Sequence, residues 1–272
     1  MTEEQVVEIL KEKYGKVSAK IIAEECGIDQ VYKVYRLAEK YGIRTNKVQN
    51  KTVGELSELQ KQILIGGIFG DGSYKKQGNG YLYRECHALA ESDYCNWKRL
   101  QLGKLTEGYV FSYSIRKSGL NEVLTFETMT TKDLEFYAKL NKNKLEAIDY
   151  MDKIGFCLFI LDDGWRVDKT DYNKGNLVFM LTIYQYEEEL RMKIIKRFKK
   201  LFGENSCTEN GIKRIDLRIH NDVSMQIAEI ILELLGSDMD IVQKKLFGNK
   251  QEKTYDDIKH LLISNKVDDS HD

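Results

Sequence analysis

The 272-residue chain contains no proline, two tryptophans, four histidines and no apolar run of membrane-spanning length. The missing apolar run excludes a transmembrane helix, and residues 1–4 do not resemble the start of a secretory signal peptide. The five cysteines do not stand at the spacing of metal ligands, so we expect reduced thiols in a cytoplasmic protein. The absence of proline beside abundant Lys, Asn, Ile and Tyr is typical of an AT-rich coding sequence.

The bulk charge of the chain indicates no particular partner. Lys and Arg number 42 and Asp and Glu number 43, which gives a formal net charge of −1. Nucleic-acid binding would therefore require basic residues gathered on one surface. The content of 42% hydrophobic and 31% charged residues is ordinary for a globular protein. The length allows one large domain or two smaller ones.

Two apolar runs that each end in Asp-Gly dominate the sequence. The first is LIGGIFGDG, residues 64–72, and the second is FCLFILDDG, residues 156–164. Each run favours a buried helix whose last turn carries a carboxylate and whose end is a glycine. A carboxylate is unfavourable there, because the helix C-terminus is the negative end of the helix dipole. Because such a carboxylate recurs, we predict that Asp71 and Asp163 bind a positively charged group, although either alone could be a simple turn residue.

Residues 1–46 predict a small all-α domain. Apolar periodicity and breaking glycines place helices over residues 6–14, 19–26 and 30–41. Two short helices joined by a glycine turn form a helix-turn-helix pattern, which indicates DNA binding. The residues of the last helix expected at the DNA are Gln30, Lys33 and Arg36. A three-helix bundle for protein contacts is the alternative, and residues 47–55 read as a polar linker.

The two Asp-Gly runs each begin the same order of predicted elements. Apolar periodicity and turn residues indicate a helix, a hairpin, a helix, a second hairpin and a closing helix, and this order then recurs. Asp71 and Asp163 stand 92 residues apart, close to the length of one unit. We therefore predict an α+β fold of two pseudo-symmetric αββαββα repeats, over residues 56–149 and 150–250, followed by a tail over residues 251–272.

Alternation along the predicted strands gathers polar and charged side chains on one face of each sheet. On a single strand such a face is simply solvated, but across two sheets readout of base edges in a major groove becomes equally plausible. The candidate DNA-contacting residues on the strands are Ser73, Lys75, Gln77, Arg84, Ser112, Ser114, Arg116, Arg166, Asp168, Thr170, Arg214, Asp216 and Arg218.

With these features the sequence resembles the LAGLIDADG homing endonucleases in their single-chain, two-repeat form. The first run matches the nine-residue signature at Leu64, Gly66, Ile68, Asp71 and Gly72. The second run is similar to the family variant that ends in two aspartates and a glycine. The resemblance covers roughly residues 56–247 and implies two motif helices packed side by side, with each sheet forming a saddle over DNA. Gly66, Gly67 and Gly70 would let the partner helix approach closely.

The resemblance also implies a metal-dependent nuclease site at the paired helix ends. Asp71 and Asp163 would meet there and share a Mg²⁺ ion, with the backbone carbonyls of Gly70 and Asp162 completing its shell. Mn²⁺ would serve as well, and Ca²⁺ is expected to occupy the site without supporting cleavage. The implied chemistry is activation of water, neutralisation of the phosphate and stabilisation of the leaving oxygen.

A basic residue near each active site is a further implication of the resemblance. Lys144 and Lys245 each precede a leucine and stand 101 residues apart, near the repeat length. A lysine in that place would polarise the phosphate or orient the attacking water. The alternative for each is a solvated surface lysine, and Lys142 and Lys244 are close competitors.

The sequence thus predicts a monomeric, metal-dependent endonuclease for double-stranded DNA. The resemblance implies a long asymmetric target, cleavage of both strands across a minor groove, and short 3′ overhangs. Two other functions fit the same repeats. One is a DNA-binding regulator without nuclease activity, and the other is an RNA-splicing maturase.

Overall fold

The computed structural model describes residues 1–13, 19–29, 31–41, 43, 52–107, 111–115, 122–167, 177–211 and 214–248. The chain divides into two compact units, residues 1–51 and residues 52–272. Among the helices in the described ranges, none combines the length and apolar character needed to span a membrane.

The N-terminal unit contains three helices, α1 (Glu3–Lys13), α2 (Ala19–Cys26) and α3 (Val31–Lys40). Its small core consists of Val6, Leu10, Ile22, Ala23, Cys26 and Val34. Gly27 joins α2 to α3 with a φ of 66°, a backbone conformation that glycine adopts without strain. The helices lie near the predicted positions, while the helix-turn-helix interpretation and its contact with DNA stay predictions.

The second unit begins with α4 (Glu58–Phe69), which carries the first motif. Ser57 accepts a hydrogen bond from the backbone of Gln60, and the Gln60 side chain accepts one from the backbone of Ser57, so the helix start is fixed. The elements that follow are β1 (Gly72–Gln77), β2 (Gly80–Ala88), α5 (Ser92–Gln101), β3 (Ser112–Ile115), β4 (Glu122–Glu127), α6 (Glu135–Lys142) and α7 (Lys144–Ala147).

The second motif helix, α8 (Lys153–Asp163), starts a second series of the same kind. Its elements are β5 (Gly164–Arg166), β6 (Phe179–Leu181), α9 (Glu188–Phe202), β7 (Cys207–Asn210), β8 (Asp216–Ile219), α10 (Asn221–Leu235) and α11 (Asp240–Val242). β6 ends three residues earlier than the sequence predicted, because the chain turns into a loop after Leu181.

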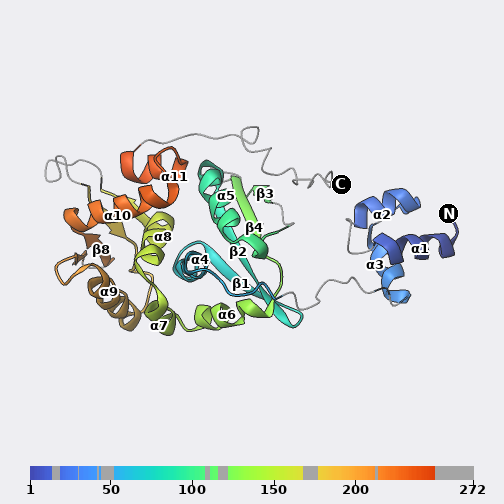
Figure 1. Ribbon diagram of the computed structural model, residues 1–272, viewed down its shortest axis with the longest axis horizontal. Coiled ribbons are helices and arrows are strands. Elements are labelled where there is room, and N and C mark those ends of the chain that lie inside the picture. The colour runs from blue at the N-terminus through green and yellow to red at the C-terminus, as the bar shows by residue number, and fades with distance from the viewer. Residues whose placement is uncertain are drawn as a thin grey trace. The chain divides into compact units, whose positions relative to one another are not determined.

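Each series forms one four-stranded antiparallel sheet. The strand orders are β1-β2-β4-β3 and β5-β6-β8-β7, so both sheets follow the same path. Within this unit, α4 and α8 lie near the middle, with one sheet to either side (Figure 1). The predicted α+β fold with two antiparallel sheets is therefore confirmed.

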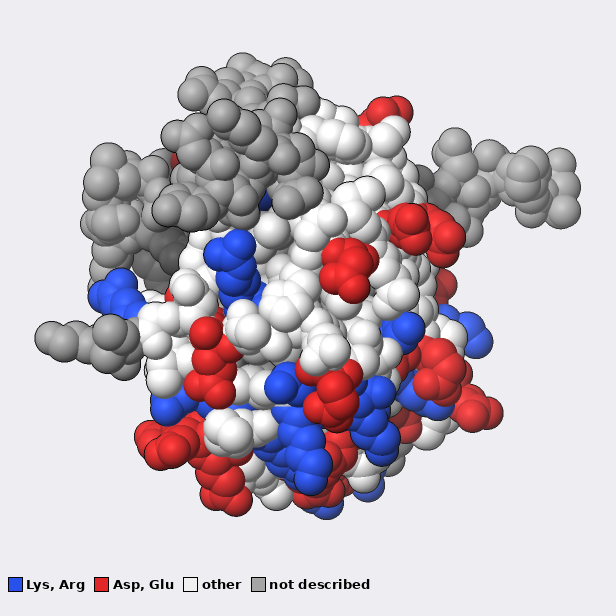
Figure 2. Space-filling view, turned by 90° about the vertical axis from the view of Figure 1, so that its left-hand side faces the viewer, with Lys and Arg blue, Asp and Glu red and all other residues white. Residues whose placement is uncertain are grey.

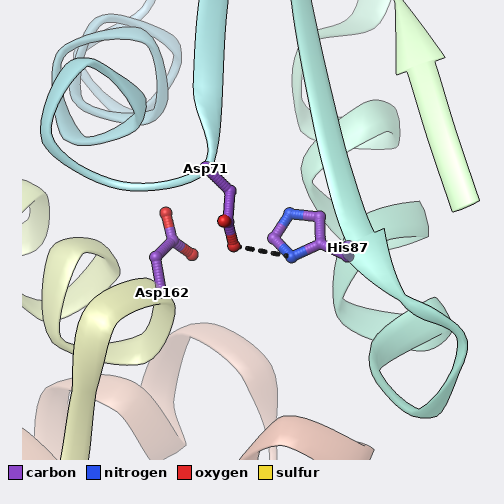
Figure 3. A group of neighbouring side chains, drawn as sticks. All are labelled: Asp71, His87 and Asp162. Atoms are coloured by element: carbon purple, nitrogen blue, oxygen red, sulfur yellow. Dashed lines mark ion pairs between the residues drawn. The ribbon is translucent and has the colours of Figure 1, made fainter. Parts of the chain in front are cut away.

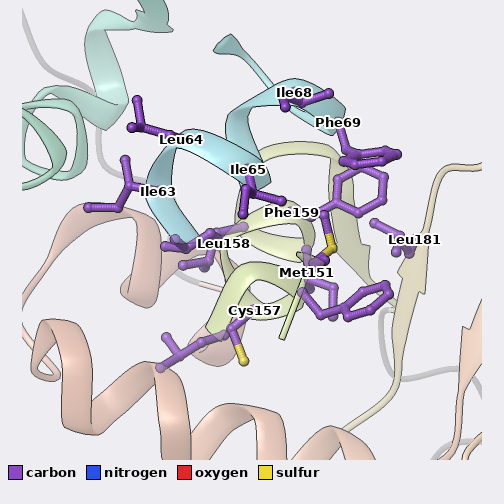
Figure 4. Packing of buried hydrophobic residues seen from close by; sticks show 14 of the residues in the cluster. Ile63, Leu64, Ile65, Ile68, Phe69, Met151, Cys157, Leu158, Phe159 and Leu181 are labelled. Atoms are coloured by element: carbon purple, nitrogen blue, oxygen red, sulfur yellow. The ribbon is translucent and has the colours of Figure 1, made fainter. Parts of the chain in front are cut away.

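The two motif helices pack directly against each other (Figure 4). The ring centroids of Phe69 and Phe159 lie 5.6 Å apart at this contact. Buried Gln62 of α4 donates to the carbonyl of Tyr150 at 3.1 Å and accepts from the amide of Asp152 at 3.0 Å. The contact therefore combines apolar packing with hydrogen bonds that fix the start of α8.

The glycines of the first motif serve two different neighbours. A Cβ at Gly66 would lie 3.3 Å from both the Gly155 carbonyl oxygen and the Leu158 Cβ of α8. A Cβ at Gly67 would instead lie 2.0 Å from the hydroxyl oxygen of Tyr83, in the sheet of the same repeat. The prediction that Gly67 makes room for the partner helix is therefore wrong. Gly155, which the sequence analysis did not single out, contributes to the close approach.

Candidate active site

The ends of α4 and α8 place the side chains of Asp71 and Asp162 together. Asp71 follows Gly70, the residue that caps α4, and Asp162 lies in the last turn of α8. A Cβ at Gly70 would lie 2.3 Å from Oδ2 of Asp162, so the bare glycine makes room for this carboxylate. Ligand atoms of Asp71, His87 and Asp162 all lie within 4.8 Å of one another (Figure 3).

This geometry differs from the predicted pairing of Asp71 with Asp163. The sequence analysis assigned Asp162 only a backbone carbonyl in the metal shell, whereas the structure directs its side chain to Asp71. Asp163 accepts a hydrogen bond from Gln185 and is influenced by the charges of Lys144 and Lys245, and burial together with the Asp162 carboxylate raises the pKa of Asp163. Asp162 takes the place predicted for Asp163 for a steric reason, because the space beside Gly70 admits the carboxylate one position earlier in α8.

Two buried side chains of α5 hold Asp162 in place. Lys98 donates to Oδ1 and Oδ2 of Asp162 at 2.8 and 3.0 Å, and the Tyr94 hydroxyl donates to Oδ1 at 3.0 Å. Lys98 also donates to Glu85 of β2, and Lys98 and Glu85 are both fully buried. Burial alone would lower the pKa of Lys98, but Asp162 and Glu85 raise it above its ordinary value. The ammonium is therefore a fixed positive charge.

His87 of β2 joins this cluster to Asp71. Its Nε2 lies 3.1 Å from Oε1 of Glu85, and its Nδ1 lies 3.4 Å from Oδ2 of Asp71. Burial alone would lower the pKa of His87, but the hydrogen bond to Glu85 and the Glu91 carboxylate, 3.8 Å from Nδ1, raise it to about 10. Burial and the Asp162 carboxylate raise the pKa of Asp71 to about 7. Burial would also raise the pKa of Glu85, but Lys98 and His87 lower it to about 2.

The two lysines predicted for the active site both lie near Asp163. The ammonium of Lys144 stands 5.1 Å from the ring centroid of Tyr186, and burial lowers the pKa of Lys144. Lys245 is 8% exposed and donates to the carbonyl of Gly164, and burial lowers its pKa as well. Lys245 is therefore not a solvated surface lysine.

The predicted DNA-contacting residues of the first sheet are exposed. They are Ser73, Lys75, Gln77, Arg84, Ser112 and Ser114. Two of them have protein partners, since Arg84 donates to Glu127 at 2.6 Å and Gln77 accepts from Thr130 at 2.7 Å. These residues could reach DNA without unfolding any part of the sheet.

The candidates of the second sheet are less uniform. Arg214 is exposed and lies over the ring of Tyr184, 5.3 Å from its centroid, and Arg218 is half-buried. Arg166 donates to the carbonyl of Leu246, and Asp216 is half-buried, so both are turned to the protein.

The other candidates lie in the N-terminal unit or outside the described ranges. Lys33 pairs with Asp29 at 2.6 Å, and Arg36 is exposed. Gln30, Arg116, Asp168 and Thr170 lie outside the described residues. On the side of the molecule seen in Figure 2, the described lysines and arginines are interspersed with acidic residues.

The buried polar cluster behind Asp71 was not predicted from the sequence. Tyr83, Glu85 and His87 alternate with exposed or half-buried residues along β2, so they fall on the buried face of the sheet. The sequence signal for this cluster was that Glu85 and His87 alternate in step with Tyr83, which places all three on one face of the strand. Lys98 gave a weaker signal, because a single lysine in a helix usually lies at the surface.

The donor set at the helix ends fits a divalent cation. Two carboxylates from different helices lie close enough for one ion to touch both, and such a pair repels itself unless a cation intervenes. Asp71 is still 37% exposed at its side chain, so the site is open on one side. An ion and a phosphate could therefore reach it from solvent.

Comparison with known proteins identifies relatives of this arrangement. A model described as the LAGLIDADG DNA endonuclease family matches residues 61–224. The homing endonuclease I-WcaI bound to its DNA recognition sequence is 17% identical, with a TM-score of 0.55, and the match covers 78% of this chain and 92% of that one. The similarity to I-WcaI supports the fold. A search of curated proteins found no match.

Two further solved structures are similar at lower TM-scores. I-GzeII in complex with its DNA target is 10% identical, covers 76% of this chain and 96% of its own, and has a TM-score of 0.40. I-DmoI in complex with DNA and Mn is 16% identical, covers 66% of this chain and 98% of its own, and has a TM-score of 0.38.

Proposed function

This chain belongs to the LAGLIDADG DNA endonuclease family, and we propose that it cuts both strands of double-stranded DNA at one long, asymmetric site. The proposed reaction requires a divalent metal ion and leaves 3′ overhangs. The observation that carries the proposal is the meeting of two motif helices whose ends present Asp71, Asp162 and Asp163. The exposed polar residues on the first sheet support a DNA-binding surface beside these carboxylates.

We assign one centre to each strand of the DNA. Asp71 and Asp162 would hold a metal ion at the first centre, and Asp163 would hold one at the second. A bound Mg²⁺ or Mn²⁺ would supply Lewis acidity toward the phosphate and lower the pKa of a bound water. The cations of I-DmoI structures, which include Mn, Ca and Mg, belong to that protein and support this choice only by analogy.

The protein's own groups would bind and orient the phosphate. Lys144 and Lys245 are fixed beside Asp163, where an ammonium would stabilise the negative charge that grows on the phosphate during hydrolysis. Lys98 is not available for this role, because it is buried and bonded to Glu85 and Asp162. It would instead keep the Asp162 carboxylate in position.

A selection of cleaved sites from a randomised double-stranded DNA library tests the proposal. We expect discrete products cut on both strands in Mg²⁺ or Mn²⁺, none in EDTA, and DNA binding without cleavage in Ca²⁺. Specific DNA retention without cleavage in any divalent metal would contradict the proposal and favour a regulator. Tight binding of a structured intron RNA in the same preparation, without DNA cleavage, would favour a maturase.

A further inference from the structure

His87 presents an unsatisfied ring nitrogen to the carboxylates at the helix ends. The side chain is fully buried, and its Nδ1 makes no hydrogen bond within the described ranges, although the Asp71 and Glu91 carboxylates lie 3.4 and 3.8 Å from it. In Figure 3 the ring faces Asp71, and Asp162 lies on the far side of Asp71 from the ring. A buried polar atom without a partner is unfavourable, so its position calls for a further group at this place.

The other ring nitrogen of His87 is held by a buried carboxylate. Nε2 lies 3.1 Å from Oε1 of Glu85, and Glu85 also accepts from Lys98 and, at 2.8 Å, from the hydroxyl of Tyr83. Metal-binding histidines commonly donate their second N–H to a carboxylate, which fixes the ring and directs the first nitrogen at the ion. Glu85 stands in that relation to His87.

The charges around the three side chains also leave room for one cation. The carboxylates that contact His87 or Lys98 are those of Asp71, Glu85, Glu91 and Asp162, and the ammonium groups bonded to them are those of Lys98 and Lys244. With these groups ionised and His87 in the neutral form that ligates metal, two negative charges remain uncompensated. One divalent ion would neutralise them.

We propose that Asp71, His87 and Asp162 form a mixed oxygen and nitrogen site for a first-row transition-metal ion, with Nδ1 of His87 as a ligand. Imidazole is a good ligand for Fe²⁺, Ni²⁺ and Zn²⁺, and Mn²⁺ accepts it beside the oxygen ligands that it prefers, whereas Mg²⁺ and Ca²⁺ take oxygen ligands. Asp162 can ligate while bonded to Lys98, because a carboxylate has about four lone-pair sites. This inference rests on the proposed function and specifies the class of metal that the first centre prefers.

Electron paramagnetic resonance of Mn²⁺ bound to the full-length protein tests the site directly. Protein freed of metal with EDTA is titrated with Mn²⁺, and Mg²⁺ is then added as a competitor. We expect Mn²⁺ to bind at least about tenfold more tightly than Mg²⁺. Electron spin-echo modulation should show coupling to a ¹⁴N nucleus, the signature of a coordinated imidazole.

The variant His87→Asn should lose the ¹⁴N coupling and bind Mn²⁺ about 10 to 100 times more weakly. The matched control is His220→Asn, because His220 contacts the backbone oxygen of Asn205 and is absent from the Asp71 cluster. This control should keep both the coupling and the affinity. If His87→Asn fails to fold, ¹⁵N-histidine labelling of the His220→Asn protein should convert the ¹⁴N coupling to a ¹⁵N coupling.

A bound Mn²⁺ without nitrogen coupling, no Mn²⁺ binding, or a coupling that survives in His87→Asn would overturn the proposal. Each of these results leaves the endonuclease proposal intact, provided that the wild-type protein cuts DNA in Mg²⁺. Conversely, a nitrogen-coupled Mn²⁺ in a protein that cuts no DNA in any metal would support the site and contradict the proposed function.

Discussion

The two motif ends are alike in sequence and yet have different surroundings. Asp71 stands at the start of β1, beside a buried cluster of acidic, basic and imidazole groups that its own repeat provides. Asp163 is the last residue of α8 and interacts with two partly desolvated lysines. The repeated order of helices and strands therefore does not extend to the charges around the two aspartates.

One position of the motif explains much of this difference. The residue before the final aspartate is Gly70 in the first motif and Asp162 in the second. The space left by the glycine is filled by the carboxylate of the other helix. The paired helices thus complement each other, and the extra carboxylate of the second motif serves the first centre.

Removal of the buried ammonium should have the largest effect on this asymmetry. Lys98→Met leaves Glu85 and Asp162 buried without their cation, so we expect a loss of about 3–5 kcal/mol in the free energy of unfolding. Urea denaturation measures it. Lys244→Met is the control, since this half-exposed partner of Glu91 should contribute about 1 kcal/mol or less. Equal losses in both variants would show that the buried cluster is not special.

The adjacent aspartates of α8 offer the next comparison. Asp162→Asn removes a buried partner of Lys98, and we expect it to lower the free energy of unfolding by about 1.5–3 kcal/mol. Asp163→Asn changes a carboxylate that hydrogen-bonds Gln185 and feels Lys144 and Lys245 only through their charges, and it should lower the free energy of unfolding by less than about 1 kcal/mol. Thermal and urea unfolding of the two proteins check this order. The reverse order would mean that Asp163, rather than Asp162, is the anchored side chain.

The glycines of the first motif should differ by a smaller amount. Gly70→Ala brings a Cβ within 2.3 Å of the Asp162 carboxylate, and we expect a loss of about 1–3 kcal/mol together with displacement of that side chain. Gly66→Ala meets α8 at 3.3 Å, and its gain in helix propensity of about 1 kcal/mol should offset the crowding. Urea midpoints of the two variants measure the difference. A neutral Gly70→Ala would refute the steric account of the paired carboxylates.

The fold followed from the sequence because its signals are local and repeated. The apolar runs over residues 64–72 and 156–164, and the turns between the predicted strands, are sufficient to predict two helices that each begin a β-rich unit. The same signals did not decide which side of α4 each glycine faces. That depends on the position of Tyr83, which tertiary packing sets.

The candidate site was predictable only in part for a related reason. The motifs pointed to Asp71, Asp163 and the lysines that follow each repeat. Which carboxylate of α8 meets Asp71 depends on a one-residue difference around the helix, and the hydrogen bonds from Lys98 and Tyr94 determine it. Neither Lys98 nor Tyr94 belongs to a motif, so the periodicity of the chain did not predict their contact with Asp162.

The smallest expected effect on the difference between the two centres comes from the N-terminal unit. Its removal should change cleavage of the two strands equally. Deleting residues 1–46 should weaken DNA binding by about tenfold and shorten the footprint, because the DNA contacts predicted for Gln30, Lys33 and Arg36 would be lost. Cleavage of both strands should persist in equal proportion. Footprinting and a dual-label cleavage assay would check this. Loss of cleavage with unchanged binding would contradict the assignment of an accessory binding module.

The most direct test of two unlike centres is a nicking assay on a target duplex with separately labelled strands. Asp71→Asn should stop cleavage of one strand, and Asp163→Asn should stop cleavage of the other, each by at least about a hundredfold. DNA affinity should stay within about threefold of the wild type, since neither residue is expected to provide binding energy through phosphate contacts. Full cleavage of both strands by both variants would contradict the account.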